Sequence, residues 1–172
     1  MLDLVVRKCQ RFSCSNSGTT GLPKAVVLTH RNFIPQYALV CEANQLPFEV
    51  RRLISLPVVH VAIASAVHTS PMGCTYPTYI LPGYDSTSYL RSIATKYKIG
   101  NLTVVPPVIL LRINSPLIHK YCLQSVRRML CGAAPLEEGP QPRMQAFLRN
   151  GRPFTQLWDI TGEPGAITRF RS

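Results

Sequence analysis

The residues best suited to chemistry lie in one short run, Ser17-Gly18-Thr19-Thr20-Gly21-Leu22-Pro23-Lys24. Its glycines can adopt positive φ angles without a Cβ penalty, so that successive backbone N–H groups can converge on an anion. Its serine and threonines add hydroxyl donors, and Lys24 adds a positive charge. This combination is typical of a loop that grips a polyphosphate, and it predicts that the chain holds a nucleotide.

The run differs from a Walker A loop, because the lysine of that loop directly follows a glycine, whereas Lys24 follows Pro23. The alternative interpretation is a surface turn rich in serine, threonine and glycine. The Pro-Lys pair and the apolar run Ala25 to Leu28 favour a phosphate loop over such a turn.

The elements that must position this loop alternate between short β-branched runs and helical patterns, which is typical of an α/β fold of layered sheet and helix. Strands are predicted near Arg11 to Ser15, Ala25 to Leu28, Leu53 to Leu56, Thr78 to Leu81, Leu102 to Val105, Val126 to Leu130 and Phe154 to Leu157. Residues at helical spacing predict a core stripe of Tyr89, Leu90, Ile93, Ala94 and Tyr97.

Three helices have clear start signals. Asn32 can cap a helix that runs to about Asn44, which would place Pro35 in the first turn. The helix that carries the core stripe is predicted to begin at Asp85 or Ser86, and a short one to run from Pro106 through Ile113.

Composition indicates one globular piece, because 46% of the residues are hydrophobic and only 16% are charged. The sequence has nineteen Lys and Arg residues and eight Asp and Glu residues, which gives a net charge of +11. These charges are scattered along the chain, so no nucleic-acid partner is predicted. The six cysteines show no C-x-x-C spacing, so neither a zinc site nor a disulfide framework is indicated.

The apolar patch Leu2 to Val6 is too short for a signal sequence or a membrane span. The predicted compartment is the cytoplasm, with the peroxisome as the alternative, and nothing indicates an oligomeric state.

The loop and the residues after it, Ala25 to Asn32, resemble the phosphate-loop signature of the adenylate-forming enzymes, the AMP-dependent synthetase and ligase family. The likeness is greatest to 4-coumarate:CoA ligase-like and fungal-type acyl-CoA ligases. Other segments resemble family motifs in the family's order, namely Leu56-Pro57-Val58-Val59-His60, Val105-Pro106-Pro107-Val108, Gly132-Ala133-Ala134-Pro135-Leu136 and Gln156 to Gly162. The resemblance implies that residues 1–172 are a partial AMP-binding domain, a fragment of the family's large N-terminal domain, with the small C-terminal domain absent. A piece of a larger sheet is expected to leave strand edges uncovered.

The resemblance implies an ATP-dependent ligase that joins a small carboxylic acid to AMP and then lets coenzyme A attack the acyl adenylate. ATP, Mg²⁺ and coenzyme A are the implied cofactors. The family's ribose-binding aspartate motif and its C-terminal lysine have no counterpart here, so this chain alone is expected to be inactive. The alternative is a degenerate, non-catalytic remnant that binds nucleotide weakly or merely folds.

By resemblance, the catalytic residues are Lys24, His60 and Thr161. The nucleotide is expected to contact the loop from Ser17 to Gly21, Lys24, the turn Gly132-Ala133-Ala134-Pro135, Trp158 and Thr161. Without the motif order, His60 would be interpreted as a core histidine. The Gly132 to Pro135 segment is equally consistent with a tight strand-to-helix turn, and both interpretations can hold.

The last motif departs from the family pattern. Leu157 and Asp159 stand where the family has glycines, and the glutamate that holds Mg²⁺ in the family falls on Gly162. A glycine offers no side-chain oxygen to a hard cation. Glu163 lies one position late and would need a bulge to replace it, so no metal ligand is predicted. Pro140 and Pro142, inside a predicted helix, are a further departure.

Overall fold

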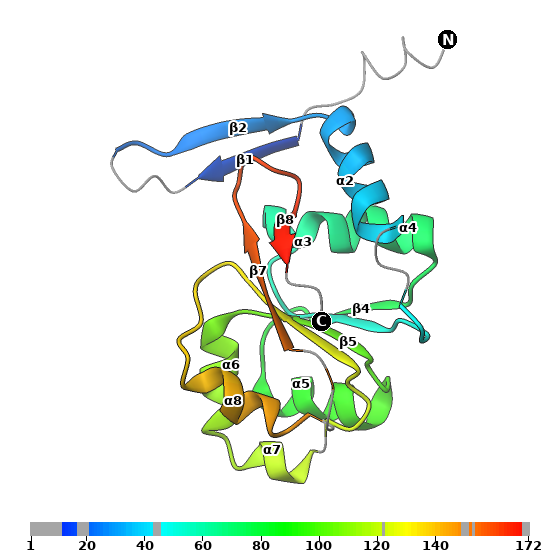
Figure 1. Cartoon of the computed structure of the whole chain (residues 1–172), viewed down its shortest axis with the longest axis vertical. Helices are drawn as coiled ribbons and strands as arrows, with labels where there is room; N and C mark the ends of the chain where they lie inside the picture. The colour runs from blue at the N-terminus through cyan, green and yellow to red at the C-terminus, as the bar shows by residue number, and fades with distance from the viewer. Residues whose placement is uncertain are drawn as a thin grey trace.

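The computed structural model describes residues 12–16, 21–42, 46–121, 123–148, 152 and 154–169. It contains a six-stranded sheet of order β4-β3-β5-β6-β7-β8, in which only the edge strand β8 is antiparallel to its neighbour, and a separate two-stranded sheet (Figure 1). The strands of the large sheet are β3 (Arg52–Ile54), β4 (Thr78–Ile80), β5 (Asn101–Val104), β6 (Arg128–Cys131), β7 (Phe154–Asp159) and β8 (Ala166–Arg169). The antiparallel pair is β1 (Phe12–Asn16) and β2 (Lys24–Leu28).

Helices cover both faces of the large sheet (Figure 1). On one side lie α5 (Ser86–Arg91), continued by the π-helical turn η2 (Ser92–Lys96), with α6 (Pro106–Ile113), α7 (Leu117–Lys120) and α8 (Pro140–Gln145). On the other side lie α2 (His30–Glu42), α3 (Val61–Ala64), its π-helical continuation η1 (Ser65–Thr69), and α4 (Ser70–Cys74). No helix among the described residues is long and apolar enough to cross a membrane.

The predicted α/β layering is confirmed, and each of the predicted strands occurs with its ends within two residues of the predicted ones. The central strands β5 and β6 are mostly buried, as expected for parallel strands with helices on both faces. In the main core, β5 and β6 pack with the stripe that was predicted from helical spacing. Tyr89, Leu90 and Ile93 of this stripe are fully buried. Strand β8 was not predicted, because its four residues carry no signal apart from their pairing with β7.

The predicted start of α2 at Asn32 is wrong. The helix begins at His30, and Oδ1 of Asn32 accepts hydrogen bonds from the backbone N–H (2.9 Å) and the hydroxyl (2.7 Å) of Thr29. The Asn32 side chain thus reaches back from the first turn to the capping residue, as in a capping box. Consequently Pro35 lies inside the helix, beyond the first turn.

The other two predicted helix starts are confirmed. Asp85 caps α5, with Oδ2 accepting from the N–H of Ser88 at 2.7 Å, and α6 runs from Pro106 to Ile113. Pro140 and Pro142 fall in the first turn of α8, where the missing N–H groups have no partner within a helix in any case. These prolines are therefore compatible with α8.

Candidate functional site

The predicted phosphate loop connects the two strands of the β1–β2 hairpin. Asn16 pairs with Lys24 at the end of the hairpin where the two strands are connected, so the residues between them form the hairpin loop. Residues 17–20, which carry the Ser17, Gly18, Thr19 and Thr20 predictions, lie outside the described residues. Gly21 is exposed, and no atom lies within 4 Å of the position that a Cβ would take. Lys24 is also exposed, so its ammonium group is accessible to an anion held by the loop.

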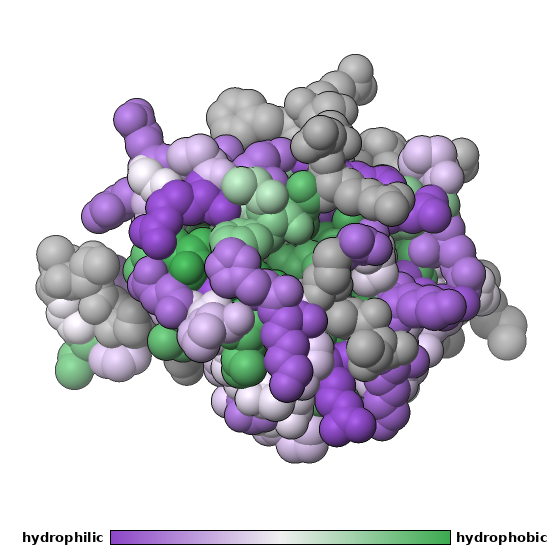
Figure 2. Space-filling model, turned by 90° about the horizontal axis from the view of Figure 1, so that it is seen from below, coloured by the Kyte–Doolittle hydropathy of each residue, from purple (hydrophilic) through white to green (hydrophobic). Residues whose placement is uncertain are grey.

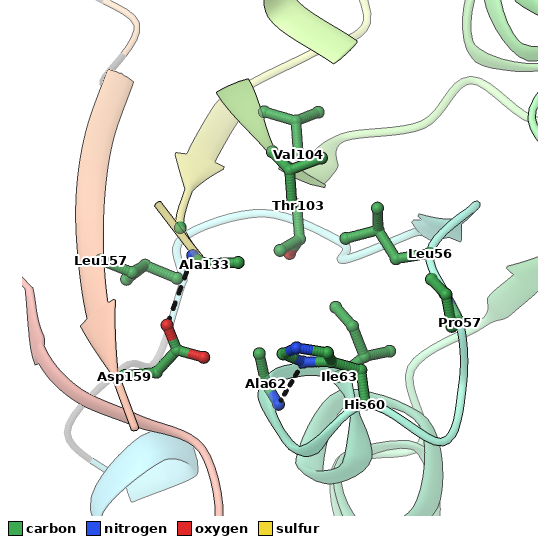
Figure 3. Close-up of a pocket in the computed structure, with 12 residues that line it drawn as sticks. Leu56, Pro57, His60, Ala62, Ile63, Thr103, Val104, Ala133, Leu157 and Asp159 are labelled. Atoms are coloured by element: carbon green, nitrogen blue, oxygen red, sulfur yellow. Dashed lines mark hydrogen bonds between the residues drawn. The ribbon is translucent and has the colours of Figure 1, made fainter. Parts of the chain in front are cut away.

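A separate pocket with a cavity volume of about 210 Å³ lies where parallel strands of the large sheet end (Figure 3). Its wall includes residues that follow β3, β5 and β6 and residues at the end of β7. This carboxyl edge is where open α/β sheets generally bind ligands. The lining residues are Leu56, Pro57, His60, Ala62, Ile63, Thr103, Val104, Val105, Gly132, Ala133, Leu157 and Asp159.

His60 borders this pocket at the start of α3. Its carbonyl accepts from the N–H groups of Ile63 and Ala64, and its ring Nδ1 accepts from the N–H of Ala62 at 3.3 Å. Because Nδ1 accepts, a neutral His60 carries its proton on Nε2, which leaves that nitrogen as a donor. The side chain is exposed, so the core interpretation of His60 is wrong.

The segment Gly132 to Pro135 is a tight turn after β6, and its first two residues line the pocket. Gly132 is buried and its N–H donates to the carbonyl of Val104 at 3.2 Å. A Cβ on Gly132 would lie 3.2 Å from Cβ of Leu157, so the absent side chain allows β7 to approach. Ala133 has a φ of 67°, in the left-handed region that favours glycine. The segment is therefore the tight turn that the sequence predicted, and its contact with the nucleotide stays a prediction.

Gln156 fixes this turn from β7. Its Oε1 accepts from the N–H of Leu136 at 3.3 Å, and its Nε2 donates to Oε1 of Gln141 in α8 at 2.9 Å. One amide side chain thereby connects the turn, β7 and α8. The sequence motif contains Gln156, but its positioning role was not predicted.

The end of β7 brings the two departures from the family pattern into the pocket. Leu157 lines the wall beside Gly132, and Oδ1 of Asp159 accepts from the backbone N–H of Ala133 at 3.3 Å (Figure 3). Leu157 and Asp159 were noted in the sequence only as departures. Their place in the pocket, like that of Thr103, was not predicted.

The structure brings only part of the predicted site together. His60, Gly132 and Ala133 share the pocket, whereas the remaining described site residues are not among its lining residues, namely Gly21, Lys24, Ala134, Pro135, Trp158 and Thr161. The Trp158 side chain is 58% exposed, and Thr161 is half-buried in the turn after β7. The roles assigned to these residues stay predictions.

The donor set does not fit a magnesium ion. The described residues contain no group of three or more His, Cys, Asp or Glu side chains that could hold a metal. Gly162 is exposed, with open space around the position of a Cβ, and Glu163 is exposed in the same turn. Cys131 stands beside the pocket turn, and burial raises the pKa of its thiol to about 11, so this cysteine is not a reactive thiolate at neutral pH.

Comparisons with known proteins agree on the family. The family model described as AMP-binding enzyme matches residues 16–168. An acyl-CoA synthetase of Alternaria alternata is 40% identical over 158 residues, covering 91% of this chain and 27% of the relative. A phenylacetyl-CoA ligase of Aspergillus niger is 42% identical over 148 residues, covering 85% of this chain and 27% of the relative. This chain thus spans about a quarter of the length of these curated relatives.

Solved structures agree on the fold. The o-succinylbenzoate CoA synthetase of Bacillus subtilis, in complex with ATP and magnesium ion, superposes with a TM-score of 0.75 at 22% identity, covering 92% of this chain and 32% of that one. The N-terminal domain of FACL13 from Mycobacterium tuberculosis gives a TM-score of 0.74 at 24% identity, covering 87% of this chain and 36% of that one. The fold is therefore that of a part of the N-terminal domain of such an enzyme.

Proposed function

Because the chain belongs to the family of AMP-binding enzymes, we propose that it is a piece of the adenylation domain of an ATP-dependent acyl- or aryl-CoA ligase. The complete enzyme would join a small carboxylic acid to AMP and then transfer the acyl group to coenzyme A. The observation that carries this proposal is the pocket at the carboxyl edge of the sheet, which has the His60 segment on one side and the Gly132 turn on the other. ATP and coenzyme A are the cofactors of this reaction.

Within this proposal, the hairpin loop holds the phosphates of ATP. Backbone N–H groups and hydroxyls from Ser17 to Thr20 would surround the phosphate oxygens, and the Lys24 ammonium would balance their charge. The pocket would hold the acyl group, with Nε2–H of His60 as a donor to the carboxylate. Trp158 and Thr161 would contact the nucleotide. Since the residues present do not fit Mg²⁺, no step is assigned to that ion.

This chain by itself is proposed to bind nucleotide without catalysing adenylation. Residues 1–172 would form part of one AMP-binding domain. The remnant interpretation is favoured by one specific observation, namely that the position of the family's glutamate is Gly162, with no carboxylate in its place. A cytoplasmic location, with the peroxisome as the alternative, and the absence of a nucleic-acid partner complete the proposal.

Calorimetry with ATP tests the phosphate loop. Lys24→Ala should weaken ATP binding by about tenfold or more, because a charge-assisted hydrogen bond contributes about 1.5–3 kcal/mol. Lys120→Ala is the matched control, since Lys120 is also exposed but lies in α7, at the end of the molecule opposite the hairpin (Figure 1). Equal ATP affinities for the Lys24→Ala variant and the unmodified chain would contradict the assignment of the loop.

A further inference from the structure

The pocket contains one acidic side chain in an otherwise mostly apolar wall. Of the lining residues, only His60, Thr103 and Asp159 have polar side chains, and only Asp159 is an acid. An ionised carboxylate beside apolar groups is less well solvated than in water, and it gains from any donor brought next to it. Asp159 is therefore the side chain of this wall best suited to accept from a charged donor.

Asp159 retains unused hydrogen-bonding capacity. Its Oδ1 accepts from the N–H of Ala133 at 3.3 Å, which is a long bond, and within the described part of the chain Oδ2 has no hydrogen bond and no ion pair. An ionised carboxylate can accept several hydrogen bonds. The side chain is half-buried, so a ligand in the pocket can supply the missing donor.

The wall around Asp159 is held in place from two sides. Leu157 packs against Gly132, with its Cβ 3.2 Å from the position that a Cβ on Gly132 would take, and the Ala133 N–H fixes one carboxylate oxygen. Figure 3 shows Asp159 entering the pocket from the end of β7 and His60 entering it from the start of α3, with Ala62 between them. A ligand in this space meets a carboxylate on one side and an imidazole on the other.

We propose that Asp159 makes this a pocket for a ligand with an apolar body and a hydrogen-bond donor, above all a protonated amine, and that it selects against a carboxylate placed beside it. Under the proposed function, on which this assignment of the pocket as the acyl site rests, the substrate class is a carboxylic acid that carries an amino or hydroxyl group away from the reacting carboxyl. Burial of an amine beside Asp159 satisfies both partners, whereas a second carboxylate would be repelled there.

Three small probes of similar size test the selectivity, namely benzylamine, benzyl alcohol and benzoate. They are titrated into the isotopically labelled chain at neutral pH, and the amide signals of Gly132 and Ala133 report binding in the pocket. Benzylamine should bind about tenfold or more tightly than benzoate, with benzyl alcohol between them.

Asp159→Asn is the decisive variant. An asparagine retains an oxygen that can accept from the Ala133 N–H, so the turn should keep its shape while the charge is lost. The ratio of benzylamine to benzoate affinity should fall to within about twofold of unity, as expected when a charge-assisted hydrogen bond is removed. Glu163→Gln is the matched control, because Glu163 is an exposed acid near the end of β7 that does not line the pocket. That variant should keep the ratio of the unmodified chain.

The proposal is overturned if benzoate binds as tightly as benzylamine, if none of the three probes shifts the Gly132 and Ala133 signals, or if Asp159→Asn keeps the amine preference. The ATP titration of the Lys24→Ala variant is independent of these results, because Lys24 does not line the pocket. Loss of the amine preference with intact ATP binding would refute only the role of Asp159. Absence of ATP binding with an intact amine preference would refute only the nucleotide assignment.

Discussion

The backbone N–H of Ala133 donates to the carboxylate of Asp159, and this bond joins the turn after β6 to the end of β7. The bond forms at a residue whose φ of 67° is unfavourable for an alanine, by about 1–2 kcal/mol. The acidic side chain that faces the pocket thus also holds the backbone that forms the pocket's wall. The effects on stability of a substitution in the turn and of a substitution in β7 should therefore be non-additive.

The close approach of β7 to the turn gives the first prediction. Gly132→Ala should lower the free energy of unfolding by about 1–3 kcal/mol, because the new Cβ would lie 3.2 Å from Cβ of Leu157 in a packed wall. Gly162→Ala, the control, places its Cβ in open space and should change stability by less than about 0.5 kcal/mol. Urea unfolding measures both variants. Equal changes in the free energy of unfolding for the two variants would show that the wall around Gly132 can accommodate the additional Cβ.

The buried guanidinium of Arg112 gives the second prediction. The residue is 0% exposed, and its three side-chain nitrogens have no hydrogen-bond partner among the described residues. Its guanidinium lies 4.1 Å from the centre of the Tyr89 ring, a contact that contributes about 2 kcal/mol. Removing a buried charge that lacks acceptors should outweigh the loss of this contact, so Arg112→Met is expected to stabilise the fold by about 1–3 kcal/mol.

Arg143→Met is the control for this charge removal, since Arg143 is exposed on α8 and should change stability by less than about 0.5 kcal/mol. Denaturant midpoints at neutral pH compare the two variants with the unmodified chain. If Arg112→Met destabilises the chain by more than about 1 kcal/mol, acceptors for the guanidinium must exist in solution.

The outer strand β4 gives the third prediction. It forms one end of the large sheet, and its Ile80 side chain is 53% exposed. Figure 2 shows a further face of the molecule, on which hydrophobic residues gather inside a rim of hydrophilic ones. An exposed apolar edge strand promotes pairing between chains, so the protein is expected to associate as its concentration rises.

Ile80→Lys should shift this association to higher concentration in sedimentation velocity, because edge lysines oppose strand pairing. Leu111→Lys adds the same charge to an exposed position of α6, away from any strand edge, and should have a smaller effect. A monodisperse, unmodified chain over the whole concentration range would refute this prediction.

The cap of α5 gives the fourth prediction, which concerns pH. The hydrogen bond from the backbone N–H of Ser88 lowers the pKa of Asp85 below its ordinary value of 3.8. A group with a lowered pKa in the folded state stabilises the protein above the unfolded-state pKa, and this contribution is lost as the pH falls through the folded-state value. Asp85→Asn keeps a capping oxygen but cannot titrate. Its thermal stability should therefore fall less steeply than that of the unmodified chain below about pH 4, and parallel pH profiles would exclude the contribution of Asp85.

The fifth prediction is that the isolated chain does not form acyl adenylates. Carboxylate-dependent exchange of labelled pyrophosphate into ATP should stay at the level of a Lys24→Ala control for cinnamic, benzoic and medium-chain fatty acids. Loss of one preorganised electrostatic group costs about 2.7–4 kcal/mol of barrier, and the family's glutamate, ribose aspartate and C-terminal lysine are all missing from this sequence. Gly162→Glu alone should not restore exchange, although its side chain has room. Exchange above the control would mean that Glu163 has replaced the missing carboxylate.

The sequence predicted those features that depend on local patterns. Buried runs such as Leu102 to Val105 identified strands, and Asp85 identified the start of α5, because each signal lies within a few residues. The Asn32 error arose because a side chain that caps a helix can act from inside the first turn as well as before it. A pattern of residue types alone does not distinguish these two positions.

The contents of the pocket depend on contacts that are distant in the sequence. Ala133 and Asp159 meet only because β6 and β7 are neighbours in the sheet, an arrangement that short-range periodicity does not specify. The position of His60 beside the pocket was expected only from the order of motifs, since a single histidine on an apolar segment is more often a core residue. The role proposed for Asp159 is inferred from the groups that surround its carboxylate in three dimensions, and the sequence does not indicate which groups these are.

The β1–β2 hairpin projects away from the large sheet (Figure 1), and within β2 only Leu28 is buried, in a small cluster with Val61. Such a segment can open while the main core stays folded, so its amide hydrogens should exchange with solvent much faster than those of β5 and β6. The loop assigned to phosphate binding therefore connects two strands that lie outside the main core. Part of the binding energy of a nucleotide would be spent on ordering this hairpin, and ligand-induced protection of its amides would measure that coupling directly.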